Sequence, residues 1–310
     1  MRFHRTSILG GALVIAPFLA QPATGAEQTT FPTQKAAIQA LADASAKRDL
    51  ERLRAILGPE GDAIVSSGDE VQDTNDLKRF AESARTRTTF VTLDDGSAIA
   101  QVGKNDWPLP IPLVKAGNRW RFDTAAGKEE LLNRRIGENE LVAIDVCRTY
   151  VDAQHEYAEV DRTGAGARTY AQRILSTPGK KDGLYWDDES GKDPSPLGPA
   201  LAEAAAEHYE FNPGEPAPYH GYYFRILTAQ GSKAPGGARS YVTDGKMRGG
   251  FGLVAYPAEY GSSGIMTFVV NQKGIVFQKN LGEKTAELGK AMTLYDPDGS
   301  WEPVVEPSED

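Results

Sequence analysis

The stretch RRIGENELVAIDVCRTYVDAQHEYAEVD, residues 134–161, decides the fold of this chain. Its apolar residues recur at spacings of three or four and stack on one helical face. They are Val142, Val146, Tyr150, Ala153, Tyr157 and Val160, with Cys147 and Val151 widening the stripe. Polar residues share the opposite face, namely Asp145, Arg148, Thr149, Asp152, Glu156 and Glu159. This pattern predicts a long helix that lies on a sheet, keeps one side in water and joins the two halves of the chain.

Residues 1–26 have the pattern of a secretory signal peptide. Arg2, His4 and Arg5 form a basic start, an apolar run extends from residue 8 to 20, and small residues follow at 24–26. Such a run is typical of a cleaved leader. The alternative is an uncleaved anchor, but the run is short for a bilayer. The sequence therefore predicts a periplasmic or secreted protein with no membrane span after removal of the signal.

The charge balance argues against a nucleic-acid partner. The chain has 34 basic and 43 acidic residues, and residues 1–26 hold two of the basic ones and no acidic one, which leaves 32 against 43, or −11. An acidic surface does not neutralise phosphates. Cys147 is the only cysteine, so no intramolecular disulfide can form. Its place beside the apolar stripe favours a buried, unreactive thiol over a reactive one.

The remaining pattern predicts an α+β protein of two domains, 27–126 and 127–302, followed by a flexible tail at 303–310. In the first domain, helices that begin near Thr33, Asp49 and Asn75 precede two hairpins with turns at 94–96 and 116–118. This order resembles the layout of nuclear-transport-factor-like domains. In the second domain, the long helix precedes strands near 219–228, 251–256, 265–270 and 275–278, with a mobile loop expected over 230–250.

Five longer segments carry a resemblance to a known family. They are WPLPIPLVK (107–115), NRRIGENEL (133–141), YAQRILSTPGKKDGLYW (170–186), GYYFRIL (221–227) and GIMTFVVNQKGIVFQKNLG (264–282). The chain resembles a bacterial family catalogued as domain of unknown function 2950, and its second half resembles periplasmic pilin-like domains. The resemblance implies an envelope location and an architecture, but no activity. Pilin-like proteins carry an acidic loop where this chain has 161–166, and the loss of acids there argues against calcium.

No motif indicates catalysis, a metal or a cofactor. The histidines outside the leader, His155, His208 and His220, are too far apart in sequence for the usual zinc spacings. The chain has neither a G-x-S-x-G nucleophile elbow nor a G-x-x-x-x-G-K-[ST] phosphate loop. We therefore predict no catalytic residue, no metal site and no cofactor.

Seven residues are candidates for ligand binding, and each has a structural alternative. Trp107 begins a proline-rich segment that could be a ligand-facing wall or a stiff edge covering a sheet. Arg134, Arg135, Glu138 and Asn139 could clamp an anionic ligand, or could cap the long helix and pair across the domain junction, with Glu138 and Glu140 favouring the dipole of a helix start. Trp186 and Tyr222 could stack on a sugar or peptide, or belong to the core.

Three functions follow from these patterns. The first is a non-enzymatic envelope protein that binds or assembles, with an envelope protein or a small ligand as its partner. The second is a hydrolase of envelope glycans or peptides that uses carboxylates near Glu138 and Glu140 or near Asp187 and Asp188. The third is a carrier of small molecules, which requires a sizeable apolar pocket in the first domain.

Overall fold

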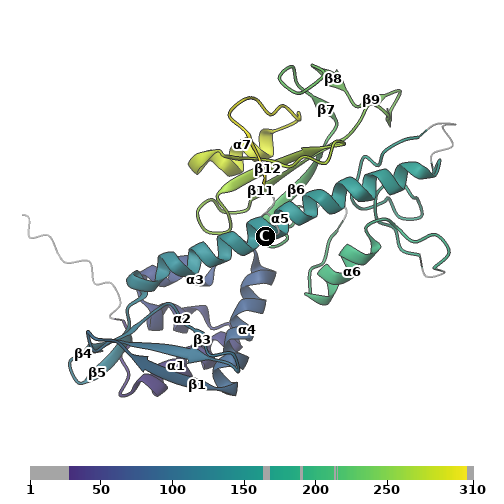
Figure 1. The fold of residues 1–310 in the computed structure, drawn as a ribbon. Helices are drawn as coiled ribbons and strands as arrows, with labels where there is room; N and C mark the ends of the chain where they lie inside the picture. The colour runs from purple at the N-terminus through teal and green to yellow at the C-terminus, as the bar shows by residue number, and fades with distance from the viewer. Residues whose placement is uncertain (1–27, 163–167, 189–190, 213, 215, 306–310) are drawn as a thin grey trace, which may run out of the picture.

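The computed structural model describes residues 28–162, 168–188, 191–212, 214 and 216–305. The predicted signal peptide, most of the 161–166 loop and the end of the predicted tail lie outside the described residues. The described chain is an α+β protein built from helices and antiparallel sheets (Figure 1). We call residues 28–123 the N-terminal unit and residues 160–305 the C-terminal unit, and helix α5 connects them.

The N-terminal unit opens with helices that start where their caps predict. In α1 (Gln34–Lys47), the hydroxyl of Thr33 accepts from the Ala36 amide at 3.1 Å. In α2 (Leu50–Leu57), the carboxylate of Asp49 accepts from the Arg52 amide at 2.9 Å. The 3₁₀ turn η1 (Pro59–Gly61), the short α3 (Asp62–Val65) and α4 (Glu70–Thr86) follow. Helix α4 begins five residues before its predicted start.

An antiparallel sheet completes this unit. Its strands are β1 (Thr88–Thr92), β2 (Ala98–Val102), β3 (Trp107–Pro108), β4 (Leu113–Ala116) and β5 (Arg119–Phe122). The strand order is β1-β2-β4-β5, and β3 pairs with β2 alone. Both predicted hairpins are confirmed. The proline-rich segment is a two-residue strand that continues into buried Leu109 and Ile111, so it both edges the sheet and enters the core.

Helix α5 (Thr124–Glu159) begins ten residues before the predicted start at residue 134. The hydroxyl of buried Thr124 donates to the carbonyl of Leu57 at 2.6 Å, which ties the first turn to α2. The expectation that Glu138 and Glu140 stabilise a helix start is wrong, because both lie in the middle of α5 and the dipole effect is confined to the terminal turns.

The predicted apolar stripe of α5 is confirmed in its C-terminal half, where Tyr150, Ala153 and Tyr157 are buried in the second core. Cys147 and Val151 are buried, whereas Val142 and Val146 are half-buried and Val160 is 51% exposed. Burial raises the pKa of the Cys147 thiol to about 12. The prediction of a buried thiol is confirmed, and at this pKa the reactive thiolate form is scarce near neutral pH.

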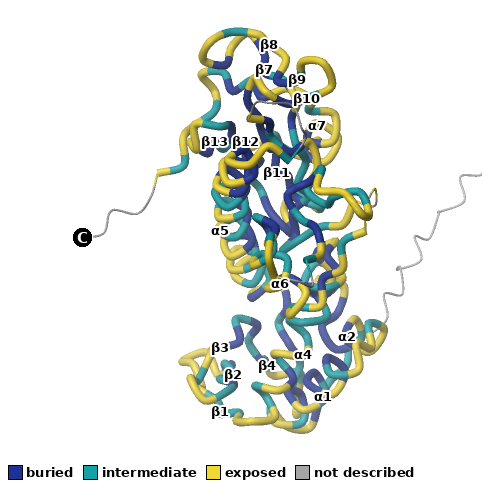
Figure 2. Tube along the Cα trace, turned by 90° about the vertical axis from the view of Figure 1, so that its right-hand side faces the viewer, coloured by how far each residue is buried: buried dark blue, intermediate teal, exposed yellow. Residues whose placement is uncertain are grey.

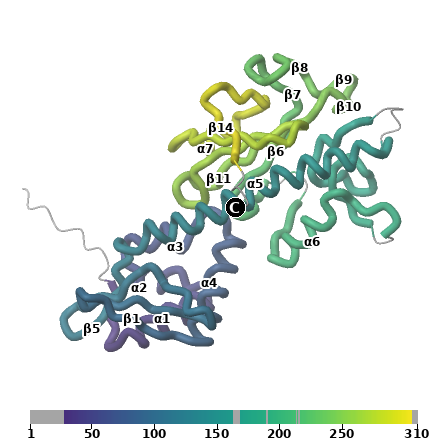
Figure 3. Tube along the Cα trace, viewed as in Figure 1, coloured from purple at the N-terminus to yellow at the C-terminus, as the bar shows by residue number. Residues whose placement is uncertain are grey.

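The C-terminal unit is a second antiparallel sheet against α5, with strand order β14-β13-β12-β11-β6. Its strands are β6 (Tyr222–Leu227), β11 (Gly252–Pro257), β12 (Met266–Asn271), β13 (Phe277–Asn280) and β14 (Glu302–Pro303). Helix α7 (Thr285–Ala291) and the turn η2 (Gly282–Lys284) flank it, whereas α6 (Gly198–Ala206) lies on the other side of α5 (Figure 1). The predicted tail begins inside β14, which is an edge strand of this sheet and pairs antiparallel with β13 (Figure 3).

The segment expected to be a mobile loop forms four short strands instead. They are β7 (Ala229–Gln230), β8 (Arg239–Ser240), β9 (Val242–Thr243) and β10 (Lys246–Met247). They make two two-stranded sheets. Buried Tyr241 donates to Gln230 at 3.0 Å, and Gln230 donates to the carbonyl of Gly237 at 2.6 Å. These side-chain contacts within the segment order a stretch whose composition indicates a loop.

The buried residues gather at both ends of the molecule, and α5 runs through both regions (Figure 2). One hydrophobic cluster lies among α1, α2 and the first sheet, and another lies between α5 and the second sheet. A third, smaller cluster lies on the other face of the second sheet. In the part of the chain that the structure describes, no helix is both long and apolar enough to span a membrane.

Buried polar groups join the two units beside the middle of α5. Asn139 is fully buried, and its amide group is bonded to the side chain of Gln72 on α4 and donates to the carbonyl of Ser263 at 2.9 Å. Gly221 lies so close that an added Cβ would be 2.6 Å from the amide nitrogen of Asn139. This contact confirms the junction alternative for Asn139.

Asp69 makes the second connection between the units. One oxygen of this buried carboxylate caps α4 by accepting from the amides of Val71 and Gln72 at 3.1 and 3.0 Å. The other accepts from the Tyr209 hydroxyl at 3.0 Å and the Gly221 amide at 2.9 Å, both in the C-terminal unit. Asp69 therefore caps α4 locally and also ties the start of this helix to residues that are far away in sequence.

Gly127→Ala is expected to destabilise the protein by about 1–3 kcal/mol, because its Cβ would lie 2.5 Å from the Ile111 Cα in a packed core. Gly137→Ala in the same helix is the control. Nothing lies within 4 Å of its added Cβ. The better helix propensity of alanine should therefore stabilise the folded protein by about 0.5–1 kcal/mol. Urea unfolding measures both, and equal effects would contradict the close approach of α5 to Ile111.

Asp69→Ala is expected to lower the free energy of unfolding by about 3 kcal/mol or more. The substitution removes a helix cap and leaves the Tyr209 hydroxyl and the Gly221 amide without their buried acceptor. The control is Asp49→Ala, an exposed cap that accepts from the Arg52 amide, for which a loss of about 1 kcal/mol is expected. Urea unfolding measures the free energy of unfolding of both variants. If Asp69→Ala loses no more stability than Asp49→Ala, the coupling of the two units is contradicted.

Candidate functional site

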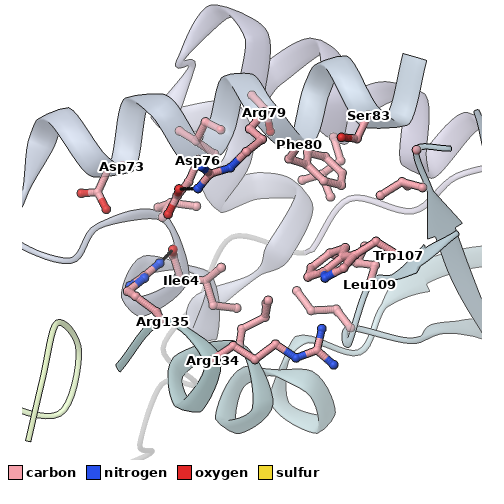
Figure 4. Close-up of a pocket in the computed structure, with 18 of the residues that line it drawn as sticks. Ile64, Asp73, Asp76, Arg79, Phe80, Ser83, Trp107, Leu109, Arg134 and Arg135 are labelled. Atoms are coloured by element: carbon pink, nitrogen blue, oxygen red, sulfur yellow. Dashed lines mark hydrogen bonds and ion pairs between the residues drawn. The ribbon is translucent and has the colours of Figure 1, made fainter. Parts of the chain in front are cut away.

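A cavity of about 530 Å³ lies in the N-terminal unit between α4, α5 and the β2–β3 connection (Figure 4). Its apolar lining comes from several elements that also form the first hydrophobic core. These residues are Leu41, Leu53, Leu57, Ile64, Val65, Leu77, Phe80, Val102, Leu109, Ile111, Leu131 and Trp107. The cavity therefore extends into the interior of this unit and has room for a small molecule.

Charged side chains line the same cavity. They are Asp73, Asp76 and Arg79 from α4, Lys104 from the β2–β3 turn, and Arg134, Arg135 and Glu138 from α5. In Figure 4, Asp73, Asp76 and Arg135 lie on one side, and Phe80, Trp107 and Leu109 lie on the other. The cavity thus has a polar end and an apolar end.

Helical spacing explains why the two helices present these groups together. On α4, residues 73, 76, 77, 80 and 83 are three or four positions apart and share one face. On α5, residues 131, 134, 135 and 138 repeat in the same way. Each helix offers carboxylate and guanidinium groups beside an apolar side chain, so the facing helices create an amphipathic space.

The two aspartates of α4 are held in a poorly solvated place. Burial raises the pKa of Asp73, although both oxygens accept from the Ser67 amide, at 3.1 and 3.0 Å, and that contact lowers it. Burial likewise raises the pKa of Asp76, while the nearby guanidiniums of Arg79 and Arg135 lower it. The neighbouring positive charges therefore compensate these carboxylates only in part.

The arginines of α5 are held by contacts around the cavity. The Arg134 guanidinium pairs with Glu130 at 2.7 Å and lies 5.2 Å from the centre of the Trp107 ring. The Arg135 guanidinium donates to the carbonyls of Ala63 and Ile64 in α3, at 3.1 Å for the former. Trp107 itself is 42% exposed. An exposed indole beside an apolar cavity offers a surface on which a ligand can pack.

The structure brings together four of the seven candidate residues, since Trp107, Arg134, Arg135 and Glu138 all line this cavity. Asn139 belongs to the junction instead. Trp186 and Tyr222 lie in the second hydrophobic core, where the Trp186 indole donates to the Asp193 carbonyl at 2.9 Å and the Tyr222 hydroxyl to the Met266 carbonyl at 2.9 Å. Neither residue lines the cavity. The sequence could not show this, because aromatic residues have the same local spacing in a core as at an exposed site.

Sequence reasoning missed Asp73, Asp76 and Arg79. A signal was present, because Asp73 and Asp76 share a helical face with Leu77 and Phe80, and carboxylates are uncommon beside an apolar stripe. The predicted helix began at Asn75, which left Asp73 outside it. Their neighbours across the cavity are about 60 positions away in the chain, and no local pattern records that distance.

The cavity holds one of the carboxylates named for the hydrolase hypothesis, Glu138. Glu140 accepts from the amides of Ile265 and Met266 at 3.0 and 2.9 Å, in the C-terminal unit. Asp187 and Asp188 do not line the cavity either. Within the described residues, no group of three or more histidine, cysteine, aspartate or glutamate side chains could hold a metal ion.

Comparison with known proteins identifies a family. The model of a family described as "Protein of unknown function (DUF2950)" matches residues 28–304, nearly the whole described chain, and the chain therefore belongs to that family. No curated protein and no solved structure matches it. The likeness to nuclear-transport-factor-like and pilin-like folds accordingly stays a prediction.

Asp73→Asn is expected to change how stability depends on pH. The unfolded carboxyl titrates near 3.8 and the folded one at a higher pH. Its contribution to stability is therefore present below pH 3.8 and is lost as the pH rises through the folded pKa. The asparagine variant lacks this loss, so its stability relative to the unmodified protein should increase over that interval in urea unfolding.

Asp95→Asn supplies a control of opposite sign. Hydrogen bonds from the Ser97 hydroxyl and amide lower the pKa of this exposed carboxyl. Its contribution is present above pH 3.8 and is lost as the pH falls through the folded pKa. A stability difference for Asp73→Asn that does not vary with pH would contradict the effect of burial on this group.

Proposed function

We propose that this member of the DUF2950 family is a non-enzymatic binding protein of the cell envelope whose ligand is a small amphipathic molecule held in the N-terminal cavity. One observation carries the proposal: the cavity of about 530 Å³ has an apolar lining at one end and convergent charged groups at the other. The export predicted from residues 1–26 puts the ligand in the envelope.

The size and chemistry of the cavity support binding of a ligand of this class. Pockets for small molecules occupy roughly 300–1,000 Å³ and combine an apolar lining with a few polar groups that orient the ligand. Leu77, Phe80 and Leu131 would cover the apolar body. The groups around Asp76 and Arg135 would set its direction.

The two units have different roles in this proposal. The N-terminal unit, for which the sequence predicts a nuclear-transport-factor-like layout, holds the ligand. The C-terminal unit, for which the sequence predicts a pilin-like layout, presents an interaction surface to an envelope partner. Helix α5 supports the combination because it contributes Leu131 and Glu138 to the cavity and Tyr150 and Tyr157 to the second core.

A carboxylate-based hydrolase is the second candidate, and one observation favours it. Asp76 from α4 and Glu138 from α5 line the same cavity, and burial raises the pKa of Asp76, as suits a general acid. Recovery of the bound compound separates the candidates. A binding protein returns it intact, whereas a hydrolase returns cleaved product, and Asp76→Asn with Glu138→Gln would stop the cleavage.

Nile red, an uncharged dye that fluoresces in apolar surroundings, is expected to bind the protein with a Kd of about micromolar. Leu131→Trp puts a larger side chain into the cavity. It should weaken the binding of the dye by about tenfold, because the cavity becomes smaller and the dye makes fewer contacts with its lining. Fluorescence titration measures both proteins, after circular dichroism has shown that the variant is folded.

The matched control is Leu288→Trp, the same replacement at an exposed position of α7 that does not line the cavity. It should leave the affinity for the dye unchanged. Equal affinity for the two folded variants, or no binding to the unmodified protein, would reject the cavity as the binding site.

A further inference from the structure

The charges of the cavity are separated along its length. Asp73, Asp76 and Glu138 are carboxylates that line it, and Arg79 and Arg135 are the guanidiniums placed among them. Three negative charges against two positive charges leave this end with a residual charge of −1. Arg134 lies with Trp107 at the other end in Figure 4, and Lys104 precedes Trp107 by three residues.

Both guanidiniums of the acidic end are already engaged. Arg79 is ion-paired with Asp76. Arg135 donates to the carbonyls of Ala63 and Ile64. An anionic ligand group placed here would face three carboxylates, and like charges at close range are unfavourable.

The carboxylates, in contrast, retain capacity to accept. An ionised carboxylate offers about four lone-pair positions. Asp73 is 6% exposed, and its carboxylate accepts from the amide and the side chain of Ser67. Burial raises the pKa of Asp73 and Asp76, so their surroundings disfavour the charged forms. A positive group brought into the cavity would offset that cost.

We infer that the cavity takes an amphipathic amine, whose apolar body packs against Leu77, Phe80 and Trp107 and whose protonated amino group lies against Asp73 and Asp76. The inference rests on the proposed binding function and names the class of its ligand. An ammonium group has three donors and no acceptor, which suits a place where carboxylate oxygens are available and the guanidiniums are engaged. The apolar end then selects an aliphatic or aromatic body next to the amine.

Competition with Nile red tests the inference at neutral pH, using octylamine, octanoate and octanol, which share one apolar chain. Octylamine is expected to displace the dye at about tenfold lower concentration than octanol, and octanoate is expected to be the weakest, since a charge-assisted contact contributes roughly that factor. The Asp73→Asn/Asp76→Asn double variant should lose the preference for octylamine, because this end of the cavity then holds Glu138 against Arg79 and Arg135.

Asp145→Asn/Asp152→Asn is the matched control, because it removes two carboxylates from the exposed face of α5 outside the cavity. The change in net charge is the same, so the preference for octylamine should survive in this variant. Its loss there would show that the preference reflects overall charge and would overturn the inference.

The outcomes separate the ligand class from the binding function. If the unmodified protein binds octanoate most tightly, or binds the three compounds equally, the amine inference is overturned while the cavity remains the binding site. If the dye does not bind, or if none of the three compounds displaces it, the proposed function itself is overturned.

Discussion

The unbroken backbone hydrogen bonding of α5 fixes how the two hydrophobic cores are placed. A helix of 36 residues is about 54 Å long, and α5 takes part in both units. Its first turns are held against the N-terminal unit by the contact of Thr124 with Leu57 and by the approach of Gly127 to Ile111. Its second half contributes Tyr150 and Tyr157 to the other core. Because each unit holds one end of the same helix, the position of α5 in one unit restrains where the other unit lies.

The buried polar contacts at the junction make one arrangement of the units favourable. Polar groups without water need partners, and Asn139 and Asp69 find theirs only when Gly221, Ser263 and Tyr209 lie beside them. Gln72, bonded to Asn139, precedes Asp73 of the cavity. The same turn of α4 thus contacts the C-terminal unit and lines the site, so the shape of the cavity depends on how the units fit together.

The candidate site was predictable from the sequence at the long helix and at the proline-rich segment, but not at α4. Arg134, Arg135 and Glu138 stand out in sequence because charges gather there, and Trp107 stands out because prolines surround it. Asp73 was not identified because α4 starts earlier than its own pattern indicates, and its start depends on Tyr209 and Gly221. Trp186 and Tyr222 were misleading, because local spacing does not distinguish an aromatic side chain in a core from one at a site.

The sequence by itself determined the α+β class, the helix caps at Thr33 and Asp49, the hairpins and the existence of the long helix. Caps, turns and amphipathic periods are local, and each is set by residues a few positions apart. Only the tertiary structure decided where α5 begins, which of its faces is buried, and that α4 and α5 enclose a cavity. Those features depend on contacts between residues tens of positions apart, such as Thr124 with Leu57 and Asp69 with Gly221, for which the sequence carries no local signal.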